Sequence, residues 1–356
     1  MLAVFHGCIC GAGKDGRCGA ALPDTTRSVP PLCAGIWKGA DIFIPPPCIF
    51  PYGMSPCILV LNDQSICHDL KGHPESEQRM EQIRSILPGG RIVLPASPVS
   101  MDDLLRVHMS EYLSRLEDLS GRCRPGGVAF LDSDTYVVSG SWDAARYAAG
   151  AAIAATEEAL SGRPAFAVVR PPGHHAGPVY GMGFCLLNNV AVAAAWSLTR
   201  VSQVAIIDWD VHHGNGTQAM FYDSDRVLYC SVHRSPFYPG TGRREETGSG
   251  AGEGCTVNVP LPAGSGSDAY LQVFQEEILP AVCSFDPDLI LISAGQDPLA
   301  DDPLGGMNLE PGDFGLLTEL VCSGARKPPA LVLEGGYGPS HGDAIMEILR
   351  VLDQWV

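Results

Sequence analysis

Residues 206–216 read Ile-Ile-Asp-Trp-Asp-Val-His-His-Gly-Asn-Gly, an apolar strand that turns directly into carboxylates and imidazoles. In an extended chain alternate side chains share a side, so Asp208, Asp210 and His212 are expected on one side and His213 on the other. Two carboxylates and an imidazole that converge at a strand end are costly unless a cation neutralises them. The stretch therefore predicts a metal site at the end of a buried strand. The alternative is an acidic strand cap whose histidines are satisfied by hydrogen bonds.

Apolar strands alternate with helices along most of the chain. Strands are expected at 58–61, 91–94, 165–169, 204–207, 227–232, 256–259, 289–293 and 330–334, and helices at 77–87, 101–119, 142–160, 188–198, 217–221, 269–282, 312–321 and 344–355. Strands that are apolar throughout and alternate with helices indicate a parallel sheet covered on both faces. The expected fold class is α/β, a single domain with about eight mainly parallel strands and helices on both faces.

The N-terminal part differs in composition from the rest. Residues 1–56 contain eight prolines, eight glycines and five cysteines, and they show no amphipathic period. Such a segment is expected to be an irregular or disordered extension rather than a domain. A single folded domain is expected to span residues 57–356.

Composition narrows the class of protein. The 356 residues are 46% hydrophobic and carry a formal net charge of −17, which argues against direct nucleic-acid binding. No apolar run is long enough to span a membrane, and the N-terminus lacks the pattern of a signal peptide. The 13 cysteines lie mostly in apolar contexts, as expected of buried thiols in a reducing cytoplasm. A homo-oligomer is compatible with these features.

Polar side chains follow four of the expected strands, at the point where each strand ends. They lie in residues 170–175, 208–212, 293–297 and 334–337. In open parallel sheets, sites form beyond the carboxyl ends of the strands. Any one of these segments could be a turn, but four together are hard to explain structurally. We expect them to form one catalytic site.

Residue chemistry at these strand ends predicts metal-assisted hydrolysis of an amide. Asp210, His212 and Asp297 can supply three ligands to a divalent ion and leave one position open, the pattern of a catalytic zinc site. Two carboxylates make the site harder than one with three histidines, so Fe²⁺ is also compatible. Such an ion would acidify water and polarise a carbonyl.

Proton transfer and oxyanion stabilisation have candidates in the neighbouring segments. A histidine of the 174–175 pair can take a proton from water and return it to a leaving amine. Tyr337 can donate a hydrogen bond to the developing oxyanion. Asp208 and Asn215 are expected to orient the two histidines.

These motifs resemble the histone deacetylase superfamily, which has the arginase-type fold. The matching stretches are Arg170-Pro171-Pro172-Gly173-His174-His175, Gly183-Phe184-Cys185, Asp208-Trp209-Asp210-Val211-His212-His213-Gly214-Asn215-Gly216-Thr217-Gln218, Ser293-Ala294-Gly295-Gln296-Asp297, Asp302-Pro303-Leu304-Gly305-Gly306 and Glu334-Gly335-Gly336-Tyr337. Their order and spacing match as well, from about residue 57 to the C-terminus. At position 215 the chain resembles class II and bacterial or archaeal members, which have asparagine there, whereas class I enzymes have aspartate.

The resemblance implies a role for each matching residue. The zinc ligands would be Asp210, His212 and Asp297. His175 would be the general base and acid, with His174 assisting electrostatically, and Tyr337 would polarise the acetyl carbonyl. Gly183 and Phe184 would line the tunnel for the acyl-lysine stem, with Leu304 at its rim. A monovalent cation such as K⁺ would bind Asp208, Asp210, His212 and Ser231, and a second near Phe221, Ser224 and Val227.

The sequence departs from the family pattern beside the last zinc ligand. Gln296 stands where the family usually has an aromatic residue, and Pro298 where a small residue is usual. Both departures are expected to affect the floor of the substrate tunnel more than the binding of the metal. Leu304 stands where a polyamine-specific relative would carry glutamate, which favours acetyl-lysine over acetylpolyamines.

Three functional hypotheses therefore remain. They are a zinc-dependent protein lysine deacetylase, an amidohydrolase for small acetylated amines such as polyamines, and a catalytically silent binding module. The last predicts a broken ligand or a missing tyrosine, and neither is seen. Of the other histidines, His213 is expected to be buried or to support the site rather than to bind metal. His68, His73 and His108 are expected on loops or helix surfaces.

Overall fold

A single parallel sheet forms the centre of the structure. The computed structural model describes residues 57–87, 89 and 91–355, and the expected extension 1–56 lies outside the described residues. Eight strands are hydrogen-bonded in the order β2-β1-β5-β10-β9-β6-β7-β8, and every pairing is parallel. Their bounds are β1 Ile58–Leu61, β2 Val93–Pro95, β5 Ala165–Val168, β6 Val204–Asp208, β7 Val227–Arg234, β8 Thr256–Leu261, β9 Leu289–Ala294 and β10 Ala330–Leu333. The predicted α/β class and strand number are confirmed.

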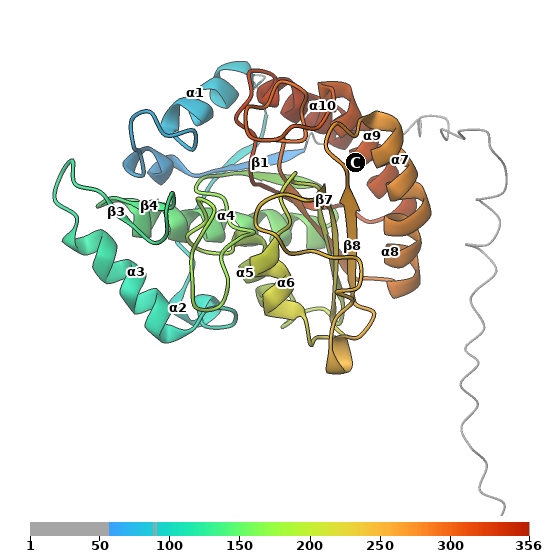
Figure 1. Ribbon diagram of the computed structural model, residues 1–356, viewed down its shortest axis with the longest axis horizontal. Coiled ribbons are helices and arrows are strands. Elements are labelled where there is room, and N and C mark those ends of the chain that lie inside the picture. The colour runs from blue at the N-terminus through green and yellow to red at the C-terminus, as the bar shows by residue number, and fades with distance from the viewer. Residues whose placement is uncertain (1–56, 88, 90, 356) are drawn as a thin grey trace, which may run out of the picture. The chain divides into compact units, whose positions relative to one another are not determined.

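Helices cover both faces of this sheet (Figure 1). One face carries α4 (Ser141–Leu160), α5 (Asn189–Ser197) and α6 (Asn215–Phe221). The other carries α1 (Glu77–Ile86), α7 (Ser267–Val273), η3 (Phe274–Ile278), α8 (Leu279–Phe285), α9 (Pro311–Ala325) and α10 (His341–Trp355). Side chains of one strand alternate between the two faces of the sheet. Leu59 therefore packs on the face covered by α1 and α7–α10, whereas Ile58 and Val60 pack on the face covered by α4–α6.

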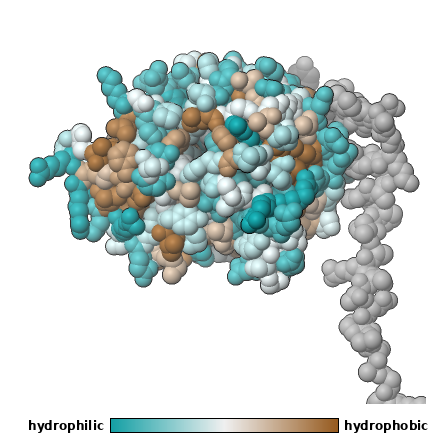
Figure 2. Space-filling model, in the orientation of Figure 1, coloured by the Kyte–Doolittle hydropathy of each residue, from teal (hydrophilic) through white to brown (hydrophobic). Residues whose placement is uncertain are grey.

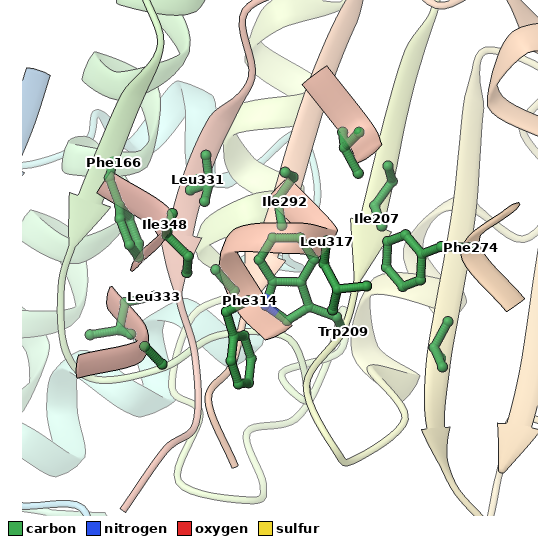
Figure 3. Packing of buried hydrophobic residues seen from close by; sticks show 14 of the residues in the cluster. Phe166, Ile207, Trp209, Phe274, Ile292, Phe314, Leu317, Leu331, Leu333 and Ile348 are labelled. Atoms are coloured by element: carbon green, nitrogen blue, oxygen red, sulfur yellow. The ribbon is translucent and has the colours of Figure 1, made fainter. Parts of the chain in front are cut away.

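The core between the sheet and α7–α10 is built around Trp209. Its indole is fully buried and lies 6.4 Å, between ring centroids, from both Phe274 and Phe314. Figure 3 shows these rings with Ile207 and Leu317 against the strands. Truncating a buried aromatic of this kind typically costs about 3–5 kcal/mol of folding free energy. Trp209 stands between Asp208 and Asp210 in the chain, so its burial anchors the backbone that carries these two carboxylates.

The helix expected at 101–119 is interrupted, which corrects that prediction. The structure has a short α2 (Met101–Leu104) and a separate α3 (Ser110–Arg122), with His108 in the break. His108 is buried rather than exposed, because its Nδ1 lies 3.0 Å from the carbonyl of Gly177 and its Nε2 accepts the N–H of Asn188. His68 is likewise buried, stacked on Tyr136.

Other departures from the expected elements are local. The helix expected at 269–282 is a run of α7, the π-helix η3 and α8. Short 3₁₀ turns occur at η1 (Asp63–Cys67) and η2 (Gly250–Gly252). A small antiparallel hairpin, β3 (Ala129–Phe130) with β4 (Tyr136–Val137), was not predicted. Figure 2 shows apolar residues gathered over this hairpin, where Val128 and Phe130 are exposed.

Sheet order explains where the site forms. The four strands with polar tails, β5, β10, β9 and β6, are consecutive neighbours in the sheet. Because they are parallel, their carboxyl ends lie along one edge, as a site in an open α/β sheet requires. Among the described residues, no helix is both long enough and apolar enough to cross a bilayer.

Candidate active site

Three predicted metal ligands converge beyond the ends of β6 and β9. His212 Nδ1 lies 3.1 Å from Asp210 Oδ1 and 3.1 Å from Asp297 Oδ2. One donor atom from each of the three residues lies within 4.8 Å of the other two. Both carboxylates are fully buried. The arrangement offers one nitrogen and two oxygens to a single ion.

Each carboxylate has one oxygen held by the backbone. Asp210 Oδ2 accepts the N–H of Gly335, and Asp297 Oδ1 accepts the N–H of Val211. The other oxygen of each faces His212, although Asp210 Oδ1 also accepts the backbone N–H of His212. Glycine is required beside them, because a Cβ atom on Gly335 would lie 2.4 Å from Asp297 Oδ2. The chain thus presents two oriented oxygen ligands.

The charges at this position fit a cation. Among the described residues, the ion pairs of Asp208, Asp210 and Asp297 are all with histidines, and no lysine or arginine neutralises them. Burial and the neighbouring charge of Asp210 raise the pKa of Asp297 to about 7. A divalent ion would reverse this penalty, because it stabilises the ionised carboxylates. Residues and charge therefore fit a metal at this point.

His174 follows β5 and lies against Asp208. Its Nδ1 is 3.1 Å from Asp208 Oδ2, and its Nε2 is 3.7 Å from Asp210 Oδ1. Burial opposes a charge on the ring, but Asp210 and Asp208 outweigh it and raise the pKa of His174 well above its usual value. Asp208 also accepts the hydroxyl of Tyr229. His174 is thus held as a cation by this cluster of carboxylates.

His175, the next residue, has the opposite character. Its Nδ1 lies 2.7 Å from Asn215 Oδ1, which can only accept a hydrogen bond. The Nδ1 atom therefore carries the proton, and Nε2 keeps a lone pair. Burial, followed by the charges of His174 and His212, holds the pKa of His175 well below its usual value. The ring is thus a neutral base in the pocket.

Tyr337 is held from both sides of its backbone. Its N–H and that of Gly338 donate to Asp302 Oδ2, at 2.6 and 3.0 Å. The Arg79 guanidinium lies 5.0 Å from the centroid of the tyrosine ring and donates to the carbonyl of Gly336. Burial, partly opposed by Arg79, raises the pKa of Tyr337 well above its usual value. The phenol therefore stays protonated and can donate.

A pocket of about 250 Å³ leads to these groups. Its lining comprises Asp134, Pro172, His174, His175, Gly183, Phe184, Asp210, His212, Phe237, Tyr238, Asp297, Leu304, Gly335 and Tyr337. Aromatic rings form much of the wall: Phe184 meets Tyr337 at 5.8 Å, and Tyr238 meets His175 at 5.2 Å, both nearly perpendicular. All the predicted tunnel residues therefore border the pocket that contains the metal-ligand group.

The remaining predicted residues lie behind the pocket or away from it. Ser231 pairs with Asp208 in the β6–β7 register, and its Oγ is 2.9 Å from His233 Nδ1. His213 turns away from the ligands, with its Nδ1 2.7 Å from the hydroxyl of Thr241. Gln296 is fully buried but does not line the pocket, and its amide donates to the carbonyl of Ala294.

Some residues of the site had no role in the sequence analysis. Asp134 reaches the pocket from the turn of the unpredicted β3–β4 hairpin. Arg79 lies on α1, far from the motifs in sequence. Asp302 and Glu334 lie inside quoted motifs, and only their contacts reveal what they hold. The turn-forming Asp132, whose carboxylate accepts the N–H of Thr135, was the one local signal for the hairpin.

Comparison with known proteins agrees with this geometry. Residues 73–351 match the histone deacetylase domain. The chain belongs to the histone deacetylase family. It is 43% identical over 294 residues to a probable deacetylase of Archaeoglobus fulgidus, covering 78% of this chain and 80% of the relative. It is 41% identical over 296 residues to a histone deacetylase-like amidohydrolase of Pseudomonas aeruginosa, covering 78% of this chain and 77% of the relative.

Solved structures give the same result. The crystal structure of the HDA15 HD domain superposes with a TM-score of 0.80 at 36% identity, covering 84% of this chain and 88% of the other. This likeness confirms the predicted deacetylase-type fold. A member of the histone deacetylase family is a hydrolase of amide bonds, and its substrate carries an acetyl group.

Proposed function

We propose that this chain is a zinc-dependent deacetylase that hydrolyses the acetyl-amide of lysine side chains in proteins. One observation carries the proposal: an aromatic-walled pocket is lined by three converging ligand residues, of which the two carboxylates are fully buried. The apolar methylene stem of an acetyl-lysine suits such a wall, and its amide would then lie beside the polar floor. Asp210, His212 and Asp297 would hold the ion.

Zinc is the ion that the donor set favours. One imidazole nitrogen and two carboxylate oxygens with room for a further ligand are typical of catalytic zinc, and Fe²⁺ remains the alternative because oxygen donors also suit it. When bound, the ion supplies Lewis acidity, which polarises the acyl carbonyl and makes water more acidic.

The residues around the ligands divide the remaining chemistry. His175, neutral and oriented by Asn215, takes the proton of the attacking water at Nε2 and returns it to the departing amine. Tyr337 donates a hydrogen bond from its hydroxyl to the oxygen on which negative charge develops. His174, held as a cation by Asp208, adds a positive charge close to that oxygen.

Monovalent cations are proposed as supporting ions. K⁺ would bind beside the active site through Asp208, Asp210, His212 and Ser231. A second ion would bind where Phe221, Ser224 and Val227 join α6 to β7. Ser231 lies directly opposite Asp208 in the sheet, which supports the first assignment.

A second candidate substrate is an acetylated polyamine. Asp134 lines the pocket and, together with neighbouring Asp132, makes part of the entrance acidic. Such an entrance favours a substrate with further positive charges. Leu304, also at the pocket, is apolar and does not extend the acidic surface. Balanced against each other, these residues favour protein acetyl-lysine as the principal substrate.

Competing substrates test the proposal directly. The ratio of kcat/KM for an acetyl-lysine peptide to that for an acetylated polyamine should exceed ten in the zinc-loaded wild type. Leu304→Glu should lower this ratio about tenfold, because one added ion pair is worth roughly 1 kcal/mol or more when partly desolvated. Leu304→Gln, of the same size without charge, should not. A wild-type preference for the polyamine would overturn the assignment to protein lysine.

A further inference from the structure

Glu334 lies directly after β10 and is completely buried. Its Oε2 atom accepts the backbone N–H groups of Gly173 and His174, at 2.6 and 3.1 Å. Its Oε1 atom accepts the hydroxyl of Ser293, at 3.2 Å. Among the described residues Glu334 forms no ion pair with a lysine or arginine, so these N–H and O–H donors and the nearby charge of His174 compensate its burial.

These contacts join three neighbouring strands. Gly173 and His174 follow β5, Ser293 belongs to β9, and Glu334 itself follows β10; the strands lie side by side in the order β5-β10-β9. Past the strand ends, the N–H of Gln296 still donates to the carbonyl of Gly335, at 3.0 Å, and joins the β9 and β10 segments. At that level, among the described residues, no backbone hydrogen bond joins the β5 segment to these two, and the Glu334 carboxylate supplies that connection.

Each connected segment delivers one part of the proposed machinery. The β5 segment carries the histidine pair 174–175, the β9 segment carries Asp297, and the β10 segment carries Tyr337. We infer that Glu334 is a positioning residue, which holds the histidine pair in register with the metal-ligand and tyrosine segments. The inference rests on the proposed function and assigns it a further residue.

The main chain of Glu334 is fixed as well as its side chain. Arg79 donates to its carbonyl and, at 2.8 Å, to that of Gly335. The side chain is therefore anchored on a restrained backbone and can impose its position on Gly173 and His174. Because a misplacement of about 1 Å in a catalytic group costs on the order of 100-fold in rate, such an anchor has a measurable consequence.

Glu334→Ala and Glu334→Gln form the principal test. In Glu334→Ala the N–H groups of Gly173 and His174 lose their acceptor. The variant's kcat should therefore fall about 10- to 100-fold, while its KM stays within twofold of the wild-type value. The glutamine oxygen can still accept both N–H groups, and its NH₂ can donate to Ser293, so Glu334→Gln should retain at least a third of wild-type kcat. If Glu334→Gln is as impaired as Glu334→Ala, the positioning role is wrong.

Leu349→Ala in α10 is the control for loss of stability. Leu349 is fully buried in the core cluster that contains α10, and it does not line the pocket. The Leu349→Ala substitution should lower the melting temperature yet leave kcat per folded protein unchanged. Equal kcat losses in Leu349→Ala and Glu334→Ala would reduce Glu334 to a structural residue. If Glu334→Ala does not fold, Glu334→Asp takes its place: wild-type kcat in that shorter variant would overturn the inference.

Amide hydrogen exchange supplies a readout that does not depend on activity. Exchange at the Gly173 and His174 amides should be at least tenfold faster in Glu334→Ala than in the wild type, and unchanged in Glu334→Gln and Leu349→Ala. Unchanged exchange in Glu334→Ala would overturn the inference even in an active enzyme. Conversely, a wild type without deacetylase activity would count against the proposed function, while the exchange result would still decide the role of Glu334.

Discussion

His175 Nδ1 lies 2.7 Å from Asn215 Oδ1, and this contact leaves Nε2 as the nitrogen that can take up a proton. A neutral amide oxygen orients the ring without adding charge. With burial as the main cause, the pKa of His175 is held well below its usual value. The proposed base is therefore held in its neutral form.

Replacing Asn215 with aspartate should change the pH dependence of the reaction. A carboxylate stabilises the imidazolium form and should raise the pKa of His175 by roughly 1 unit or more. Activity falls at low pH because His175 becomes protonated there. In Asn215→Asp this fall in kcat/KM should therefore occur at higher pH than in the wild type. Asn215→Ala, which adds no charge, should lower kcat without that displacement. Identical acidic limbs in Asn215→Asp and the wild type would show that His175 is not the titrating base.

Tyr337→Phe should remove most of the activity and little of the stability. Loss of one donor to an oxyanion typically lowers kcat about 10²- to 10³-fold. The Tyr337 hydroxyl has no hydrogen-bond partner within the described chain, so its removal leaves no unsatisfied group. Metal content should stay at the wild-type value. Retention of more than a tenth of kcat would assign the carbonyl contact to another group.

Metal removal should destabilise the wild type but not Asp210→Asn. Chelation leaves two buried carboxylates facing each other, and the pKa of Asp297, raised to about 7 by burial and by Asp210, reflects that penalty. Metal at 1,000 times its Kd contributes about 4 kcal/mol to folding. Differential scanning calorimetry should show a fall in wild-type Tm on chelation. Asp210→Asn lacks one of the ligand oxygens, so its Tm should be the same with and without the chelator.

Buried His108 should make folding sensitive to acid. Burial lowers its pKa to about 4, against 6.5 for an exposed histidine, and its Nε2 accepts the Asn188 N–H only when unprotonated. Between pH 6.5 and about 4 the unfolded chain therefore binds an extra proton, and stability falls as pH falls.

Glutamine at position 108 can reproduce one donor and one acceptor without titrating. Between pH 6.5 and pH 5, urea denaturation should show a loss of stability about 2 kcal/mol smaller in His108→Gln than in the wild type. Any effect of acid on metal binding is common to both proteins and cancels in the comparison. Equal losses would mean that His108 does not titrate on unfolding.

A chain that begins at Cys57 should fold and remain active. The Cys57 N–H donates to Asp353 at 2.9 Å, and a terminal ammonium there could keep the same contact. The family match begins only at residue 73. Circular dichroism and kcat should therefore match those of the full chain, within a factor of about two in rate, a margin below roughly 0.5 kcal/mol. Failure to fold would place residues 1–56 within the structural domain.

The fold was predictable because most of its strands contain a short run of apolar residues, although the ends of β2, β7 and β8 differ from the expected ones. Ile58–Leu61 and Ala165–Val168 are buried on both faces, so periodicity was not needed to find them. The break at His108 was not predictable, since it depends on Gly177 and Asn188, 69 and 80 residues away. Two-residue strands such as Ala129–Phe130 are too short to carry a pattern.

In the candidate site, side chains within the motifs could be placed, including Asp208 and Asn215 beside the histidine pair, whereas residues from other elements could not. Asp210, His212 and Asp297 follow strand ends, and parallel topology brings strand ends together. Asp134 and Arg79 belong to other elements and reach the site only through tertiary packing.

Zinc titration of the chelated protein tests the central claim most directly. Deacetylation of an acetyl-lysine peptide should be absent without metal, rise linearly, and reach its maximum at one zinc ion per chain. Asp210→Asn should stay inactive throughout the titration while remaining folded. Full activity in the metal-free wild type, or equal recovery in Asp210→Asn, would contradict the assignment of Asp210, His212 and Asp297 as the catalytic metal site.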